Sequence, residues 1–150
     1  MEKVTIGRFD KADFPDLHLE DIAVKVDTGA YTSSIHCDHI VEEKGVLKCT
    51  FLDEEHPLYN GRHYKFSDYD IVFVKSSNGI VQKRYQIQTT IKLFGKSRKI
   101  SLSLSARQEM RFPVLLGRKF ITRKFIVDTE LYDLSYKHKQ NEHKDPIKEQ

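Results

Sequence analysis

The stretch Val26-Asp27-Thr28-Gly29-Ala30 lies between an apolar run, Ile22 to Val26, and a Ser/Thr-rich segment that begins at Tyr31. This pattern predicts a strand that runs into the stretch and a second strand that leaves it. Gly29 permits a tight turn whose amides can point back at the Asp27 carboxylate, and the Thr28 hydroxyl adds a donor nearby. We therefore expect an acid held on a turn at the end of a strand.

A second segment, Pro113-Val114-Leu115-Leu116-Gly117-Arg118, predicts an apolar strand that ends in glycine and can pack beside such a turn. Asp-Thr-Gly alone is ordinary turn chemistry, so the two segments together are the stronger signal. A near repeat, Val127-Asp128-Thr129, has Glu130 where a glycine would complete it. We interpret Asp128 as a strand-end residue, and a mechanism with paired acids then requires two chains.

The composition indicates one globular domain, because the chain has 150 residues of which 39% are hydrophobic. Many short strands predict a mainly β fold, a small closed barrel, with one short helix near the C-terminus within residues 118–124. Residues 1–135 are expected to form the barrel domain, and the polar residues 136–150 a flexible tail. The expected strands are 4–9, 22–26, 32–37, 46–52, 71–75, 80–90, 99–105, 112–116 and 125–128.

Between the expected strands, Asn78-Gly79 predicts a hairpin with a two-residue turn. This hairpin is either an ordinary part of the barrel or a mobile cover over a site. Residues 53–70 are polar, contain Pro57 and Gly61, and predict a long loop.

Charge and cysteine content favour a cytoplasmic protein with acidic partners. The formal net charge is +3, and no apolar run approaches the ~18 residues of a membrane helix. No signal peptide precedes the first expected strand, and we expect no membrane association. The basic residues follow no recognition-helix pattern, so we expect no nucleic-acid partner. Cys37 and Cys49 are expected to be reduced thiols, with a bridge between neighbouring strands as the alternative.

Several segments together resemble one bacterial family. They are Lys25 to Ala30, Thr32 to His36, Ser77-Asn78-Gly79 with Arg84, and Arg107 to Arg118. The turn and the apolar strand are similar to those of retropepsins, single-domain aspartic proteases that work as homodimers. The wider set resembles the family labelled ATP-dependent zinc protease, which includes the retropepsin-like RimB proteins. These are associated with a ligase that adds glutamates to a ribosomal protein. The family pattern has an arginine where this chain has Tyr31.

The resemblance implies an endopeptidase in which Asp27, Thr28 and Gly29 of two subunits meet at a shared axis. The two Asp27 carboxylates would share one proton and activate a water molecule. Thr28 would form hydrogen bonds across the axis, and Leu116 and Gly117 would support the turn from behind. Ala30 and His36 would support the site. Arg118 would brace the dimer or the turn, with a simple surface arginine as the alternative.

If the substrate is a glutamate-rich tail, four cations are candidates for binding its carboxylates. A forked guanidinium suits a carboxylate, and each cation alone has a structural or solvated role as its alternative. The candidates are Lys25, Arg84, Arg107 and Arg111. The competing function is a catalytically inactive barrel that binds an acidic peptide or a partner protein.

The family label prompts two further tests of the sequence. Gly95-Lys96-Ser97 ends like a phosphate-binding loop, but Thr90 stands where the first glycine belongs, so we expect no ATP and no other cofactor. His36-Cys37-Asp38-His39 with Cys49 offers zinc-ligand types. On a strand, however, His36 and Cys37 would face opposite sides, and no H-E-x-x-H helix exists. We therefore expect no metal, and we interpret His36 as a structural hydrogen-bonding residue beside the turn.

Overall fold

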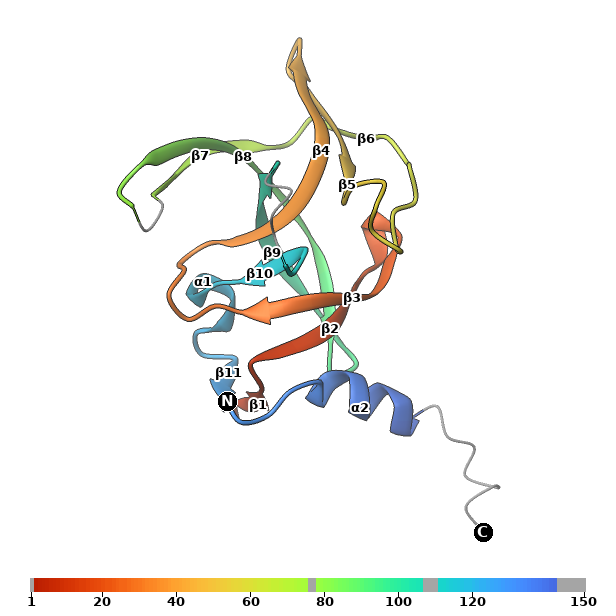
Figure 1. Ribbon diagram of the computed structural model, residues 1–150, viewed down its shortest axis with the longest axis vertical. Coiled ribbons are helices and arrows are strands. Elements are labelled where there is room, and N and C mark those ends of the chain that lie inside the picture. Colours follow the sequence, from red (N-terminus) through yellow and green to blue (C-terminus); the bar gives the residue numbers. More distant parts are fainter. Residues whose placement is uncertain (1, 76–77, 107–110, 143–150) are drawn as a thin grey trace.

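The computed structural model describes residues 2–75, 78–106 and 111–142 and shows a mainly β protein (Figure 1). Its strands are β1 (Val4–Ile6), β2 (Phe9–Phe14), β3 (Leu19–Val26), β4 (Ser33–Glu43), β5 (Val46–Phe51), β6 (Tyr64–Phe66), β7 (Asp70–Lys75), β8 (Val81–Leu93), β9 (Lys96–Ser105), β10 (Val114–Leu116) and β11 (Phe125–Val127). The described helices are α1 (Arg118–Ile121), α2 (Leu134–Glu142) and a 3₁₀ turn at Pro15–Leu17. Neither α1 nor α2 is long and apolar enough to cross a membrane.

Six strands close into a barrel. β10 runs parallel to β3 on one side and antiparallel to β4 on the other, and β4 in turn pairs with β9. The ring continues from β9 to β8, from β8 to β2 and from β2 back to β3. The predicted closed β-barrel is therefore confirmed. The short β10 inserts between β3 and β4, which places Leu116 opposite Val26, the residue before the acid.

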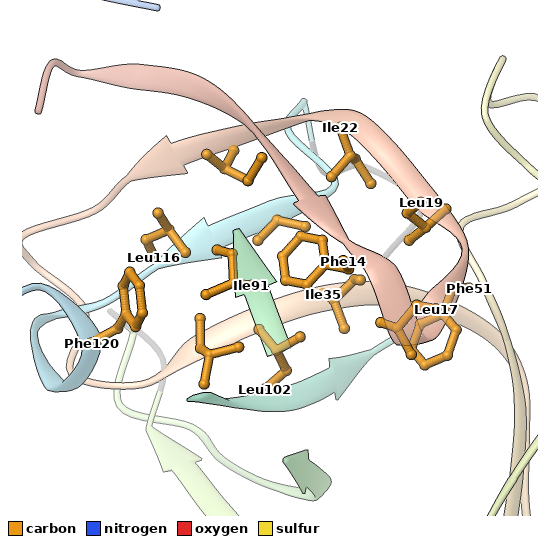
Figure 2. Packing of buried hydrophobic residues seen from close by; sticks show 14 of the residues in the cluster. Phe14, Leu17, Leu19, Ile22, Ile35, Phe51, Ile91, Leu102, Leu116 and Phe120 are labelled. Carbon is orange, nitrogen blue, oxygen red and sulfur yellow. The ribbon is translucent and has the colours of Figure 1, made fainter. Parts of the chain in front are cut away.

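The barrel interior is a continuous apolar core (Figure 2). Ile100, Leu102 and Leu104 of β9 are all buried in it, as the alternation of that strand predicts. Phe14 and Leu116 are fully buried, and burial of each side chain of this size contributes about 1.5–3 kcal/mol. The core therefore holds β10 and the end of β3 in place.

The β7–β8 hairpin reaches away from the barrel and carries exposed apolar side chains. β7 pairs with β8 alone, and Phe73 is 71% exposed. The predicted hairpin is confirmed, but the prediction that a two-residue turn connects its strands is wrong. The strand pairing ends at Lys75 and Val81, so the connection takes residues 76–80, of which Ser76 and Ser77 lie outside the described residues.

Two strands escaped the sequence analysis. β2 contains Asp10 and Asp13, which make it look like a loop, yet Asp10 is buried because its carboxylate has backbone partners. β6 lies inside the expected long loop at 53–70, where Tyr64 packs edge-on against Phe51. In both cases tertiary contacts outweigh the local composition.

The C-terminal segment begins as a docked helix, so a flexible tail from residue 136 onward is wrong for the described part. The Asp10 carboxylate accepts hydrogen bonds from the backbone amides of Ser135 and Tyr136, at 2.8 and 3.1 Å. Further along α2, the Lys139 ammonium lies 2.8 Å from Asp21 and 3.1 Å from Asp13. A boundary at 135/136 therefore falls inside α2, and residues 143–150 lie outside the described residues.

Candidate active site

The turn after β3 holds Asp27 through backbone hydrogen bonds. The Asp27 amide donates to the Leu116 carbonyl of β10 at 2.9 Å, and the Ala30 amide donates to the Asp27 carbonyl at 3.2 Å. The Gly29 amide donates to Asp27 Oδ1 at 3.1 Å, as the sequence predicts. Asp27 is half-buried, and its carboxylate accepts this bond through one oxygen.

The backbone at Gly29 is not left-handed, since Gly29 is absent from the described residues with positive φ. A Cβ at this position would lie 3.4 Å from Asp27 Oδ1, which is an ordinary van der Waals contact. The Thr28 hydroxyl has no hydrogen-bond partner among the residues described, while the Thr28 carbonyl accepts a bond from Arg118 Nη1 at 2.9 Å.

Gly117 packs directly against the backbone that follows the turn. A Cβ at Gly117 would lie 2.6 Å from the carbonyl oxygens of both Tyr31 and Thr32, closer than real contacts allow. The Gly117 amide donates to Ser33 Oγ at 3.0 Å, and Ser33 is 3% exposed. Sequence reasoning missed Ser33. Ser33 follows Thr32 in a polar segment, where a serine has no distinctive pattern. Its hydrogen-bond partner, Gly117, is 84 residues away in the sequence.

The start of α1 continues this support. The Arg118 amide donates to the Ala30 carbonyl, and the Lys119 amide donates to the Tyr31 carbonyl, both at 2.9 Å. With its side-chain bond to Thr28, Arg118 contacts the turn from two directions. Of the alternatives weighed for Arg118, this geometry matches a brace of the turn within one chain.

Three of the four predicted carboxylate-binding cations are described by the structure, and these three do not form a cluster. Lys25 is exposed on β3, and Arg111 is exposed before β10. Arg84 lies on β8, where its guanidinium donates to Gln82 Oε1 at 3.1 and 3.2 Å. No hydrogen bond, ion pair or shared hollow links these three side chains in the described part of the chain. Arg107 lies outside the described residues.

His36 lies within β4, and its side chain faces Asp53. Nε2 lies 3.1 Å from Asp53 Oδ2, an ion-pair distance, but neither ring nitrogen is aligned for a hydrogen bond with a described residue. Beside this pair, burial lowers the pKa of His56; the charge of Asp53 raises it, and that of His36 lowers it further. The contact of His36 is therefore with the loop after β5, rather than with the turn of Asp27.

The two cysteines are buried free thiols on neighbouring strands. The Cys37 thiol donates to the Ile35 carbonyl at 3.6 Å, and burial and the adjacent Cys49 raise the pKa of Cys37. Within residues 2–75, 78–106 and 111–142, no group of three or more His, Cys, Asp or Glu side chains is arranged to hold a metal ion.

A closed barrel with an Asp-Thr-Gly turn braced by a strand ending in Leu-Gly defines a retropepsin-like domain. The family model described as RimB-like, retropepsin-like aspartic endopeptidase RimB, matches residues 5–138. The chain therefore belongs to this family.

Curated relatives carry a different activity in their names. Proteins named probable alpha-L-glutamate ligase from Shewanella halifaxensis and Desulfotalea psychrophila are each 36% identical to this chain, over 130 and 135 residues. These matches cover 84% and 86% of this chain but only 28% and 29% of the relatives, so the chain spans less than a third of their length.

A solved structure has the same fold. It is a protein of unknown function from Legionella pneumophila, with a TM-score of 0.68 and 30% sequence identity. The match covers 89% of this chain and 99% of that one. The barrel thus corresponds to nearly the whole of a separately solved protein chain.

Proposed function

We propose that this protein is an aspartic endopeptidase that acts as a homodimer, with one Asp27 from each chain. The observation that carries the proposal is the geometry of Asp27, whose carboxylate is held by the Gly29 amide and whose backbone amide is held by β10, while Thr28 and Gly29 stay exposed. Membership of the retropepsin-like family supports this assignment.

The chemistry follows from two carboxylates in contact. They cannot both ionise cheaply, so one retains a proton and the other removes a proton from a water molecule. The water oxygen forms a bond to the peptide carbonyl carbon, and the protonated acid gives its proton to the carbonyl oxygen. The C–N bond then breaks as the leaving nitrogen takes up a proton. The pair titrates as a unit.

We propose that the second acid comes from a second chain. In the described residues, the one donor to the Asp27 carboxylate is the Gly29 amide, and no other carboxyl group contacts it. Asp128 lies beyond β11, and its carboxylate accepts a bond from the Glu130 amide. Exposed apolar side chains on the β7–β8 hairpin, Phe73 and Ile80, also suit contact with another molecule.

For the substrate we propose glutamate-rich tails of a protein, such as a ribosomal protein in the cytoplasm. The relatives are named for glutamate ligation, and a peptidase that removes added glutamates would oppose that reaction. The net charge of +3 favours an acidic substrate.

The decisive experiment compares Asp27→Asn with Asp128→Asn, the acid of the near repeat. We expect Asp27→Asn to lower cleavage of a glutamate-rich peptide by about 10³-fold, with the fold and dimer retained, and Asp128→Asn to cleave normally. Sedimentation should give a dimer for the wild-type protein and both variants.

A separate test concerns metal dependence. Full activity of the wild-type protein in strong chelator would exclude a metal-dependent hydrolase.

One outcome would favour the competing function. If wild-type protein binds the peptide but never cleaves it from acidic to neutral pH, the barrel is a binding module. A monomer that cleaves at the full rate would also contradict the proposed dyad.

A further inference from the structure

A basic hollow lies between the start of β4, the strands β8 and β9, and α1. It has a volume of about 170 Å³, room for several water molecules or one acidic side chain. Three lysines supply its charge, Lys99, Lys119 and Lys124. Hydroxyl and amide groups of Ser101 and Gln86 supply neutral hydrogen-bonding groups, and no carboxylate lines it.

The cations of this hollow lack partners of opposite charge. Within the described residues, no salt bridge involves any of the three lysines; Lys124 Nζ donates to the Phe120 carbonyl at 2.8 Å. Burial lowers the pKa of Lys124, and the charge of Arg98 lowers it further. An anion placed in the hollow would relieve this repulsion and provide an acceptor for the lysine ammonium groups.

A second hollow extends the basic surface along α1. Lys119 and Lys124 line both hollows, and the second adds Tyr31, Arg118 and Arg123, again with no carboxylate. On the opposite side, a neighbouring hollow shares Gln86 and Gln88 with the first but contains Asp68 and Asp70. The electrostatic surface therefore favours an anionic chain that runs over α1 and disfavours one that runs toward β7.

The basic hollow is attached to the Asp27 turn. Lys119 donates its amide to the Tyr31 carbonyl, and Ser33, which lines the hollow, accepts the Gly117 amide. Both residues belong to the backbone that braces the acid. A ligand in the hollow would lie against the segment that leads from Asp27 into β4, on the same chain.

We propose that the basic hollow binds a side-chain carboxylate of an acidic peptide and serves as an exosite that holds the substrate beside the Asp27 turn. This inference rests on the proposed peptidase function for its role as an exosite. Its cations are separate from Lys25, Arg84 and Arg111. Within the 170 Å³ hollow a peptide is favoured over a nucleic acid, because the aromatic ring that lines it, Phe120, is only 4% exposed and offers no stacking surface. The exposed ring of Tyr31 belongs to the second hollow.

The test measures peptide binding in the absence of turnover. Fluorescein-labelled hexaglutamate is titrated with Asp27→Asn protein at low salt and followed by fluorescence anisotropy. Adding Lys99→Gln and Lys119→Gln should weaken binding by about tenfold and make it less sensitive to salt. The matched control adds Lys44→Gln and Lys137→Gln, two exposed lysines that line neither basic hollow, and should stay within about twofold. Thermal unfolding of each variant checks the fold.

The outcomes separate this inference from the proposed function. Equal binding of hexaglutamate by the two double-lysine variants would overturn the exosite, even if the wild-type protein cleaves the peptide. Tighter binding of hexathymidylate than of hexaglutamate would overturn it in favour of a nucleic acid. If wild-type protein binds inorganic phosphate as tightly as hexaglutamate, and both lose affinity equally in the Lys99/Lys119 variant, the hollow is a nonspecific anion site and the peptide exosite is overturned. Selective loss of hexaglutamate binding without any wild-type cleavage would support the hollow and contradict the peptidase.

Discussion

The Asp27 turn and the β7–β8 hairpin differ in how many contacts the rest of the chain makes with them. The turn is held by backbone hydrogen bonds from β10 and α1. Where the hairpin extends beyond the barrel, β7 and β8 pair only with each other. Its side chains Phe73 and Ile80 are 71% and 63% exposed. Both project on the same side of the molecule in the view of Figure 1. The comparison teaches that a single chain completes the support of its acid but leaves the apolar hairpin uncovered.

The largest effect should follow from filling the space behind the turn. Gly117→Ala places a Cβ 2.6 Å from two backbone carbonyl oxygens, which cannot move without displacing the turn. We expect a loss of about 3 kcal/mol in the free energy of unfolding, measured by urea denaturation. The control is Gly29→Ala, where the new Cβ meets only the Asp27 side chain at 3.4 Å and the loss should stay below about 0.5 kcal/mol. Similar losses in both variants would contradict a rigid support.

The hairpin should respond in the opposite way. Phe73→Ser removes an exposed ring, so the free energy of unfolding should change by less than about 0.5 kcal/mol. Peptide cleavage or dimerisation should nevertheless fall about tenfold, because the ring is available to another molecule. Steady-state kinetics and sedimentation measure the two. A stable variant with unchanged activity and dimerisation would show that the exposed ring has no partner.

A smaller change sharpens the first half of the comparison. Ser33→Ala removes the oxygen that accepts the Gly117 amide and leaves that buried donor unsatisfied. We expect a loss of about 1–2 kcal/mol, by the same denaturation assay. Ser34→Ala, the neighbouring buried serine for which the structure gives no side-chain hydrogen bond, is the matched control. Equal losses of stability in the two variants would show that the effect comes from changing a buried residue of the strand. The hydrogen bond between Gly117 and Ser33 would then contribute nothing measurable.

The smallest effect concerns acidic assay conditions. The folded-state pKa of His56 is lowered from its usual 6.5, first by burial. The unfolded chain then binds more protons below about pH 6.5, so stability should fall as the pH drops from 6.5 through the folded-state value. His56→Gln should flatten this dependence by less than about 0.5 kcal/mol, since solvent screens the partly exposed ring. Thermal unfolding at pH 7 and pH 5 measures this pH dependence. A stronger loss of stability at pH 5 in His56→Gln than in the wild-type protein would contradict the prediction.

The barrel and its acid turn were predictable because their signals are local. Asp27, the strand before it and the apolar segment ending at Gly117 lie in short patterns of residue type and alternation. What could not be predicted depends on distant partners. Asp10 looks like a loop residue until Ser135 and Tyr136 supply its hydrogen bonds, and α2 looks like a tail until the same contact docks it.

The cations show the same limit. In the sequence, Lys99, Lys119 and Lys124 contribute only to a modest basic excess, because no spacing relates a residue of β9 to residues in and after α1. Barrel closure brings them around one hollow. In contrast, the two described arginines chosen for their forked guanidinium groups lie apart in the chain, Arg84 on β8 and Arg111 before β10.

The insertion of β10 between β3 and β4 has a consequence for biosynthesis. The amide of Asp27 binds the carbonyl of Leu116, a residue that a ribosome adds long after the acid itself. At about 5–20 residues per second, a nascent chain carries its acid for several seconds before the supporting segment emerges. The order of translation thus delays maturation of the turn.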